Sequence, residues 1–203
     1  MIITSSKSEI TMNNFGIYRQ VQGNPANSYA DWLILDYNTF MTSTAAQLRR
    51  AQLRDIAPLR TLFVHALETD FDYFPHRYLR QVKRQHSVPR LVVSLLKKQR
   101  IILIAALDKR IVGYMVGSGH QDGVGELYWL YVHPSQRGQR VGTKLLQQAI
   151  GELRQQGMHT VRLMTHKFER YYKRYGFEVC GTYAIESLEV KIMQLRFEGS
   201  THG

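Results

Sequence analysis

The residues best suited to chemistry lie between positions 125 and 146, in the sequence GELYWLYVHPSQRGQRVGTKLL. An apolar strand pattern there runs into a short turn with Arg137, Gly138 and Gly142, and an apolar helical pattern follows directly. The first backbone N–H groups of a helix have no partners within it, and with the positive end of the helix dipole they attract anions. Glycine lets a phosphate approach the backbone closely. The spacing therefore predicts a pyrophosphate site, although it matches neither GxxxxGK(S/T) nor GxGxxG.

Two short motifs resemble those of the GCN5-related N-acetyltransferase (GNAT) superfamily. The sequence RGQRVG at 137–142 is similar to the family's motif A, Q/R-x-x-G-x-G/A between a strand and a helix, with Arg140 in place of the first glycine. The sequence YKRYGF at 172–177 is similar to its Y-x-x-x-G-F motif. The resemblance spans residues 49–196 and implies the GNAT fold, an α/β (α+β) domain. Its central sheet is expected to be mixed and mostly antiparallel, with helices on both faces.

The resemblance implies an acetyl-CoA site built from both motifs. The strand backbone at Leu130, Tyr131 and Val132 would bind pantetheine, with the Leu130 N–H polarising the thioester carbonyl. Thr165 stands where the family often has an asparagine that contacts pantetheine. The pyrophosphate would be bound by Arg137, Gly138, Gln139, Arg140, Val141, Gly142 and Thr143.

The departure at Arg140 leaves two conformations to consider. In an ordinary helical conformation its N–H stays available and its guanidinium can add to phosphate binding. A positive φ would weaken binding, since side chains other than glycine rarely adopt it. We expect the helical conformation, because the rest of the motif is intact.

Tyr172 is the residue that the resemblance implies as the acid for the departing thiolate. A phenol with a pKa near 10 can donate that proton only if it is held against the sulfur. The alternative is a core tyrosine whose hydroxyl is hydrogen-bonded to the backbone. Cys180 lies outside both motifs, so we expect direct attack by the amine in a ternary complex, and we expect Cys180 to be a small buried residue.

Glu126 stands where several family members carry a catalytic glutamate, eleven residues before Arg137. An ammonium group must lose a proton before it attacks, and a carboxylate can take it, often through water. Strand alternation places Glu126 on one face with Tyr128, Leu130 and Val132. A solvent-facing carboxylate at the start of the strand is the equally open alternative.

In the family, the loop between the first two helices lines the acceptor pocket. The corresponding segment here is ETDFDYF at 68–74, so the acceptor amine would enter beside it. Its three carboxylates and three aromatic rings suit a cationic amine. The same residues are also typical of a helix end followed by a turn, and this reading stays open. The spacing of His133 and His166 from carboxylates predicts no metal site.

Hydrophobic periodicity supplies the elements that must position these residues. Apolar patterns predict strands at 51–53, 100–107, 111–118, 125–132, 160–165, 177–183 and 188–196. Helical spacing predicts helices from Ile56 to Leu67 after an N-cap at Asp55, and at 75–85, 138–155 and 167–175. We expect an N-terminal extension at 1–48, partly mobile or docked, a GNAT domain at 49–197 and a tail at 198–203.

Composition narrows the class of protein further. One cysteine excludes an internal disulfide framework, and the longest apolar run, IILIAAL at 101–107, is far shorter than the roughly 20 residues of a membrane span. The N-terminus does not resemble a secretory signal, so we expect a cytoplasmic protein without membrane contact. The formal charge is +11, and ten basic residues and one acidic residue lie between 77 and 110. This run is either a solvated surface or a site for an acidic partner.

These observations favour an acetyl-CoA-dependent N-acetyltransferase that acts on a primary amine of a small molecule or a protein, without a metal. The alternative is a non-catalytic GNAT-like module that senses acyl-CoA or binds RNA or an acidic partner. A homodimer stays open. We do not expect nucleic acid as a partner, although the sequence leaves it open, because aromatic residues do not alternate with the basic ones as stacking platforms would.

Overall fold

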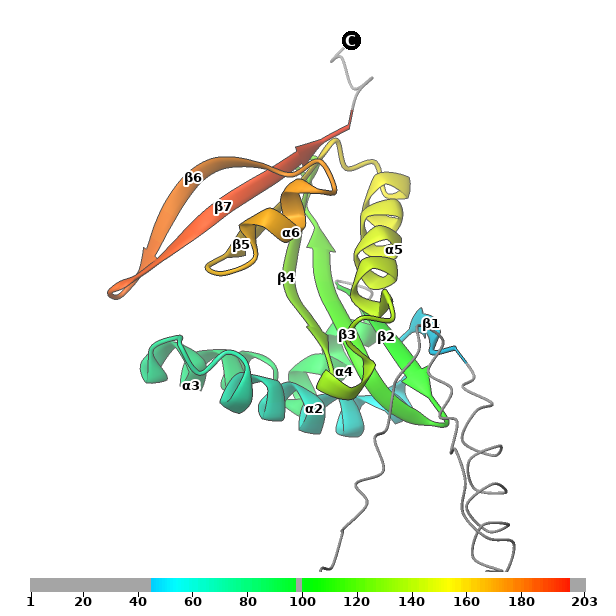
Figure 1. Ribbon diagram of the computed structural model, residues 1–203. Helices are drawn as coiled ribbons and strands as arrows, with labels where there is room; N and C mark the ends of the chain where they lie inside the picture. The colour runs from blue at the N-terminus through cyan, green and yellow to red at the C-terminus, as the bar shows by residue number, and fades with distance from the viewer. Residues whose placement is uncertain (1–44, 98–99, 198–203) are drawn as a thin grey trace, which may run out of the picture. The chain divides into compact units, whose positions relative to one another are not determined.

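A seven-stranded sheet organises the protein, whose computed structural model describes residues 45–97 and 100–197 (Figure 1). The strand order is β1-β2-β3-β4-β5-β7-β6, and of the described neighbours β4 and β5 alone run parallel. The strands are β1 Gln47–Arg50, β2 Ile101–Leu107, β3 Arg110–Gly119, β4 Val124–Val132, β5 Thr160–Thr165, β6 Glu178–Ile185 and β7 Leu188–Arg196. The helices are α2 Ile56–Thr69, α3 His76–Gln85, α4 Val88–Leu96, α5 Val141–Gln155 and α6 Glu169–Lys173, with short 3-10 turns η1 Leu53–Asp55 and η2 Pro134–Gln136. The predicted α/β architecture with a mixed, mostly antiparallel sheet is confirmed.

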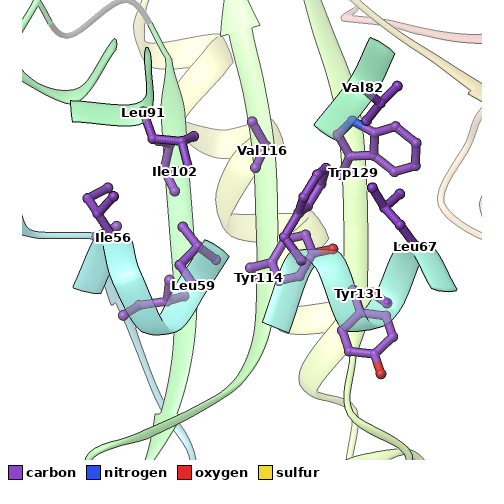
Figure 2. Packing of buried hydrophobic residues seen from close by; sticks show 14 of the residues in the cluster. Ile56, Leu59, Leu67, Val82, Leu91, Ile102, Tyr114, Val116, Trp129 and Tyr131 are labelled. Carbon is purple, nitrogen blue, oxygen red and sulfur yellow. The ribbon is translucent and has the colours of Figure 1, made fainter. Parts of the chain in front are cut away.

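Helix α2 covers one face of the sheet, because its apolar residues recur at helical spacing and form a continuous stripe. Helices α3 and α4 pack on the same side (Figure 2). The labelled residues of this cluster are Ile56, Leu59 and Leu67 of α2, Val82 of α3, Leu91 of α4, and the strand residues Ile102, Tyr114, Val116, Trp129 and Tyr131.

Helix α5 covers the opposite face, so helices lie on both faces as predicted. Leu145, Leu146 and Leu153 of α5 are fully buried in a second cluster with residues of β2 to β5. A Cβ added at Gly125 of β4 would lie 2.8 Å from the Leu153 side chain. Glycine at this position therefore lets α5 pack directly on the sheet.

Strand β4 contains a bulge that changes which face its side chains occupy. Val116 of β3 pairs with Trp129, but the next residue, Gly117, pairs with Leu127, which leaves Tyr128 as the extra residue. Leu127 consequently packs in the second cluster, beneath α5 (the α5 cluster). Trp129 packs in the first cluster, beneath α2 (the α2 cluster).

The bulge corrects the expectation that Glu126, Tyr128, Leu130 and Val132 share one face. Leu130 and Val132 pack against the α5 cluster. Glu126 precedes the bulge and alternates with Leu127, which belongs to that same cluster. Glu126 and Leu130 therefore lie on opposite faces of the sheet.

The structure also corrects several predicted bounds. Residues 51–53 form no strand, because the Asp55 carboxylate accepts hydrogen bonds from the Gln52 N–H (2.7 Å) and the Arg49 guanidinium (2.6 Å) and turns the chain into η1. Helix α4 was not predicted, α5 begins at Val141 rather than 138, and α6 is shorter than 167–175. The remaining strands and helices lie close to their predicted positions.

The predicted N-terminal extension at 1–48 overlaps β1, which begins at Gln47. Residues 1–44 and the predicted tail at 198–203 lie outside the described residues. None of the helices in the described part of the chain combines the length and the apolar character needed to cross a membrane.

Candidate functional site

Strands β4 and β5 diverge and leave an opening in the sheet. They pair only over Val124–Leu127 and Thr160–Leu163. Beyond Leu127 strand β4 continues along β3 to Val132, while the described residues supply no partner strand on its β5 side. Such an opening offers backbone N–H and C=O groups to a ligand.

A cavity of about 680 Å³, here called the larger cavity, lies between this opening and the N-terminus of α5. Small-molecule sites typically occupy roughly 300–1,000 Å³, so a cofactor-sized ligand suits it. Three cations, Arg137, Arg140 and Arg174, line it, and none of its lining residues is acidic. The predicted residues that the structure brings together here are Leu130, Val132, Arg137, Gly138, Arg140, Val141, Gly142, Thr143 and Tyr172.

The turn that leads into α5 is open toward this cavity. Gly138 has φ +81°, and a Cβ placed there would meet no atom within 4 Å. The 15-residue helix α5 then starts at Val141, with its first N–H groups at the cavity. Together, the helix N-terminus, Arg140 and Arg174 give the cavity an electrostatic preference for anions.

The expectation of an ordinary helical conformation at Arg140 is wrong. Arg140 has φ +59° and ψ +15°, the left-handed conformation, at the N-cap position where the chain turns into α5. Its C=O accepts the first helical hydrogen bond, from the Lys144 N–H at 3.0 Å. A side chain in this conformation costs roughly 1–2 kcal/mol, a cost that glycine would avoid.

Arg137 is bound by the protein's own groups. Its Nη2 donates to Asp70 Oδ1 at 2.7 Å and its Nε donates to the Val132 C=O at 3.0 Å. Burial by itself would raise the pKa of Asp70, but the hydrogen bond and charge of Arg137 bring it below its ordinary value. This ion pair ties the phosphate-facing turn to the end of α2.

Tyr172, on α6, is held by aromatic neighbours. Its ring packs edge-on against Tyr171 (centroids 5.1 Å apart) and Phe177 (5.9 Å). Burial, with smaller contributions from Tyr171 and Tyr73, raises its pKa above the ordinary value for tyrosine. The phenol is protonated at neutral pH, as an ordinary tyrosine is, and the raised pKa makes it a weaker acid.

A second, smaller cavity of about 110 Å³ adjoins the first. Phe71, Tyr73 and Phe74 line it, and we call it the aromatic cavity. The two cavities share Leu130, Phe168 and Tyr172 as lining residues. Tyr172 thus stands at the wall between an anion-attracting space and an aromatic one.

The carboxylates of the 68–74 segment do not line the aromatic cavity. Glu68 pairs with Lys83 Nζ at 2.6 Å and Asp70 pairs with Arg137. Asp72 is exposed and lines a separate depression beside α3. Of the 68–74 segment, only the aromatic residues line this cavity, so the expected mixture of carboxylates and aromatic rings is corrected.

Four predicted site residues lie away from the larger cavity. Tyr131 is buried on the α2 face and stacks on Tyr114, and Gln139 is exposed outside the cavity lining. Thr165 lines the aromatic cavity, and its Oγ1 accepts a hydrogen bond from the Phe168 N–H at 3.0 Å. Glu126 lies 3.3 Å from His120 Nε2, with 45% of its side chain exposed, and lines neither cavity.

Cys180 is exposed, not buried as expected, because it lies on the edge strand β6.

Sequence reasoning missed several residues of the larger cavity, namely Gln136, Phe168, Tyr171, Arg174 and Tyr175. Helical spacing around Tyr172 would have found two of them, Phe168 and Tyr175, since residues three and four apart share a helix face. The Tyr175 hydroxyl lies 2.7 Å from Thr143 Oγ1 on α5, and the Arg174 guanidinium lies over the Tyr171 ring. The first of these contacts joins the chain just after α6 to the start of α5.

Comparison with known proteins agrees with this geometry. The sequence pattern of the Acetyltransferase (GNAT) family matches residues 60–177, more than half of the chain. No curated protein is similar enough in sequence to match.

Several solved structures have a similar fold. The PaiA N-acetyltransferase of Thermoplasma acidophilum, in complex with coenzyme A, is 20% identical with a TM-score of 0.64 over 76% of this chain and 100% of its own. YncA of Salmonella typhimurium, a putative acetyltransferase with acetyl-CoA, is 21% identical with a TM-score of 0.62 over 78% and 98%. The ribosomal-protein-alanine N-acetyltransferase of Brucella melitensis is 21% identical with a TM-score of 0.60 over 74% and 99%.

Proposed function

Because the chain belongs to the Acetyltransferase (GNAT) family, we propose that it transfers the acetyl group of acetyl-CoA to a primary amine by direct attack in a ternary complex. The residues at the larger cavity fit coenzyme A, since Arg140, Arg174 and the N-terminus of α5 meet there, while the third arginine, Arg137, pairs with Asp70. Coenzyme A or acetyl-CoA is bound in two of the similar structures. The observation that carries the proposal is that Tyr172 lines both this cavity and the aromatic cavity.

Acetyl-CoA supplies an activated acyl group, and the chain's own residues would bind and orient it. The turn around Gly138 and the first N–H groups of α5 would hold the pyrophosphate, with Arg140 and Arg174 adding charge. The β4 backbone at Leu130 would polarise the thioester carbonyl, because a fixed N–H stabilises developing negative charge without reorganising.

Proton transfers complete the proposed reaction. The amine nitrogen bonds to the acetyl carbon, the carbon–sulfur bond breaks, and the thiolate receives the Tyr172 hydroxyl proton, which solvent then replaces. The amine gives up a proton to a base before or during attack. Glu126 is our proposed base, and it would act through water, because it lines neither cavity.

Calorimetric titration with acetyl-CoA and with desulfo-CoA tests the cofactor site, and thiol release with a panel of amines tests the activity. We expect one-to-one binding of both ligands and amine-dependent release of coenzyme A. Binding without thiol release for any amine would favour a sensor of acyl-CoA. No binding at millimolar ligand would overturn the proposal.

A further inference from the structure

A groove between α3 and α4 continues from the aromatic cavity. It measures about 590 Å³ and shares Tyr78, Tyr128 and Trp129 with that cavity as lining residues. A ligand whose amine reaches Tyr172 through the aromatic cavity would therefore extend into this groove. We call it the α3–α4 groove.

The charged side chains of the α3–α4 groove are both cations. Arg90 and Arg100 line it, and none of its lining residues is acidic. The surrounding chain has the same character, since residues 73–107 contain eight lysines and arginines and no aspartate or glutamate. A groove of this kind attracts a carboxylate or phosphate.

Within residues 45–97 and 100–197, neither groove cation is neutralised by an acidic group. Arg90 is exposed and has no ion pair among the described side chains. The contacts of Arg100 in this part of the chain are with neutral groups, the Tyr128 ring and His86 Nε2 at 3.3 Å. Burial lowers the pKa of His86 to about 4, so this histidine stays uncharged at neutral pH. By contrast, Lys83 on the same helix as Tyr78 already pairs with Glu68.

The groove is also too large for a simple amine. Its volume falls in the range that holds drug-sized ligands, roughly 300–1,000 Å³, and apolar residues such as Val82 and Val93 line it between the cations. The aromatic cavity, at about 110 Å³, has room for little more than the reacting amine and a short side chain.

We propose that the acceptor is a polypeptide with acidic residues beside the acetylated amine, and that these residues bind Arg90 and Arg100 in the α3–α4 groove. This inference rests on the proposed acetyl transfer. It names the acceptor class and gives the basic α3–α4 region a binding role.

Matched peptides test it by their rates of coenzyme A release. Three peptides share their first residue and carry Glu, Gln or Lys at positions two to five, and a second set presents the amine as a lysine side chain. We expect kcat/KM for the Glu peptide to exceed that of the Gln peptide at least tenfold. Arg90→Glu should reverse the order of the Glu and Lys peptides, and Arg100→Gln should lower the Glu-to-Gln ratio. Arg77→Gln, an exposed α3 residue outside the cavities described, is the control and should keep the wild-type ratio.

Fluorescence anisotropy with labelled peptide, in the presence of coenzyme A, separates this inference from the proposed activity. Binding of the Glu peptide that Arg90→Glu abolishes, without acetyl transfer, would uphold the groove and overturn the transferase. Acetyl transfer with equal rates for all three peptides would overturn the groove and uphold the transferase. Displacement of the Glu peptide by a short RNA that binds more tightly would overturn the acidic peptide as the occupant.

Discussion

The proposed acid role of Tyr172 depends on a single atom, its hydroxyl oxygen. Tyr172 lines both the larger and the aromatic cavity, and its phenol is protonated at neutral pH, as an ordinary tyrosine is. We expect Tyr172→Phe to lower kcat about 100-fold, which is typical of a lost general acid, and to leave the Kd of acetyl-CoA almost unchanged. Single-turnover kinetics with calorimetry checks both quantities.

Tyr175→Phe is the matched control for that substitution. It removes a hydroxyl that contacts Thr143 at 2.7 Å, in the larger cavity but outside the aromatic one. We expect it to weaken acetyl-CoA binding several-fold with a smaller effect on kcat. Equal kcat values for Tyr172→Phe and wild type, with the chemical step rate-limiting, would contradict the acid role.

His86 makes the stability of the fold depend on pH. It is buried, stacks on Phe63 at 4.6 Å, and has its pKa lowered to about 4 from 6.5. Between pH 6.5 and 4 the unfolded chain binds a proton at this histidine and the folded chain does not, so falling pH favours unfolding. We expect the free energy of unfolding to fall by about 2 kcal/mol from this group between pH 7 and pH 5.

Urea unfolding of wild type and His86→Phe at the two pH values measures this contribution. The variant keeps a ring against Phe63 but cannot bind a proton, so its pH dependence should be weaker by about 2 kcal/mol. His65→Gln, an exposed residue of α2, is the control and should behave as wild type. The same pH dependence in wild type and His86→Phe would refute the assignment.

At the scale of elements, the turn before α5 has a residue in a conformation that favours glycine. Arg140 has φ +59°, so Arg140→Gly should relieve backbone strain and raise the free energy of unfolding by about 0.5–1 kcal/mol, after the entropy that glycine gains in the unfolded chain. Arg140→Ala keeps the Cβ and should bring no such gain. Chemical denaturation of the two variants gives the comparison.

Both substitutions remove the same guanidinium from the larger cavity. We therefore expect acetyl-CoA to bind each variant several-fold more weakly than wild type in calorimetry, since a cation near phosphate is lost. A glycine variant no more stable than the alanine variant would show that the left-handed conformation is not maintained in solution.

Local patterns predicted most elements but not the contacts that refine the site. Strands β2 to β5 and helix α5 follow from apolar periodicity, and the nine predicted residues around the larger cavity follow from two short motifs. The sequence of helix α4 has helix-start signals of its own, Ser87 at the N-cap and Pro89 in the first turn.

The rest depends on partners far apart in the chain. The bulge at Tyr128 is defined by pairing with β3, and no feature of β4 alone indicates it. Asp70 turns away from the aromatic cavity because it meets Arg137, 67 residues later. Glu68 is held by Lys83, on a different helix. Alternation and composition cannot reveal such pairs.

At the scale of the whole molecule, the positive charge is divided among different sites. Of the basic residues between 77 and 110, Arg90 and Arg100 line the α3–α4 groove, while Lys83 is neutralised by Glu68. The net charge of +11 is therefore no measure of a general affinity for anions. The phosphate-facing larger cavity and the α3–α4 groove would each select an anion of a different substrate.

Both core clusters, all seven strands and the larger cavity lie within 45–197. A chain that starts at residue 45 should therefore bind acetyl-CoA with the affinity of the full chain.

A chain that starts at residue 49 loses the pairing of Gln47 and Leu48 with Ala106 and Ala105, and also the packing of Leu48 against the α5 cluster. We expect its free energy of unfolding to be about 1–2 kcal/mol lower, from lost apolar burial and hydrogen bonds. Denaturation and calorimetry of the three chains test this, and equal stability of the two shortened chains would show that β1 contributes little to the fold.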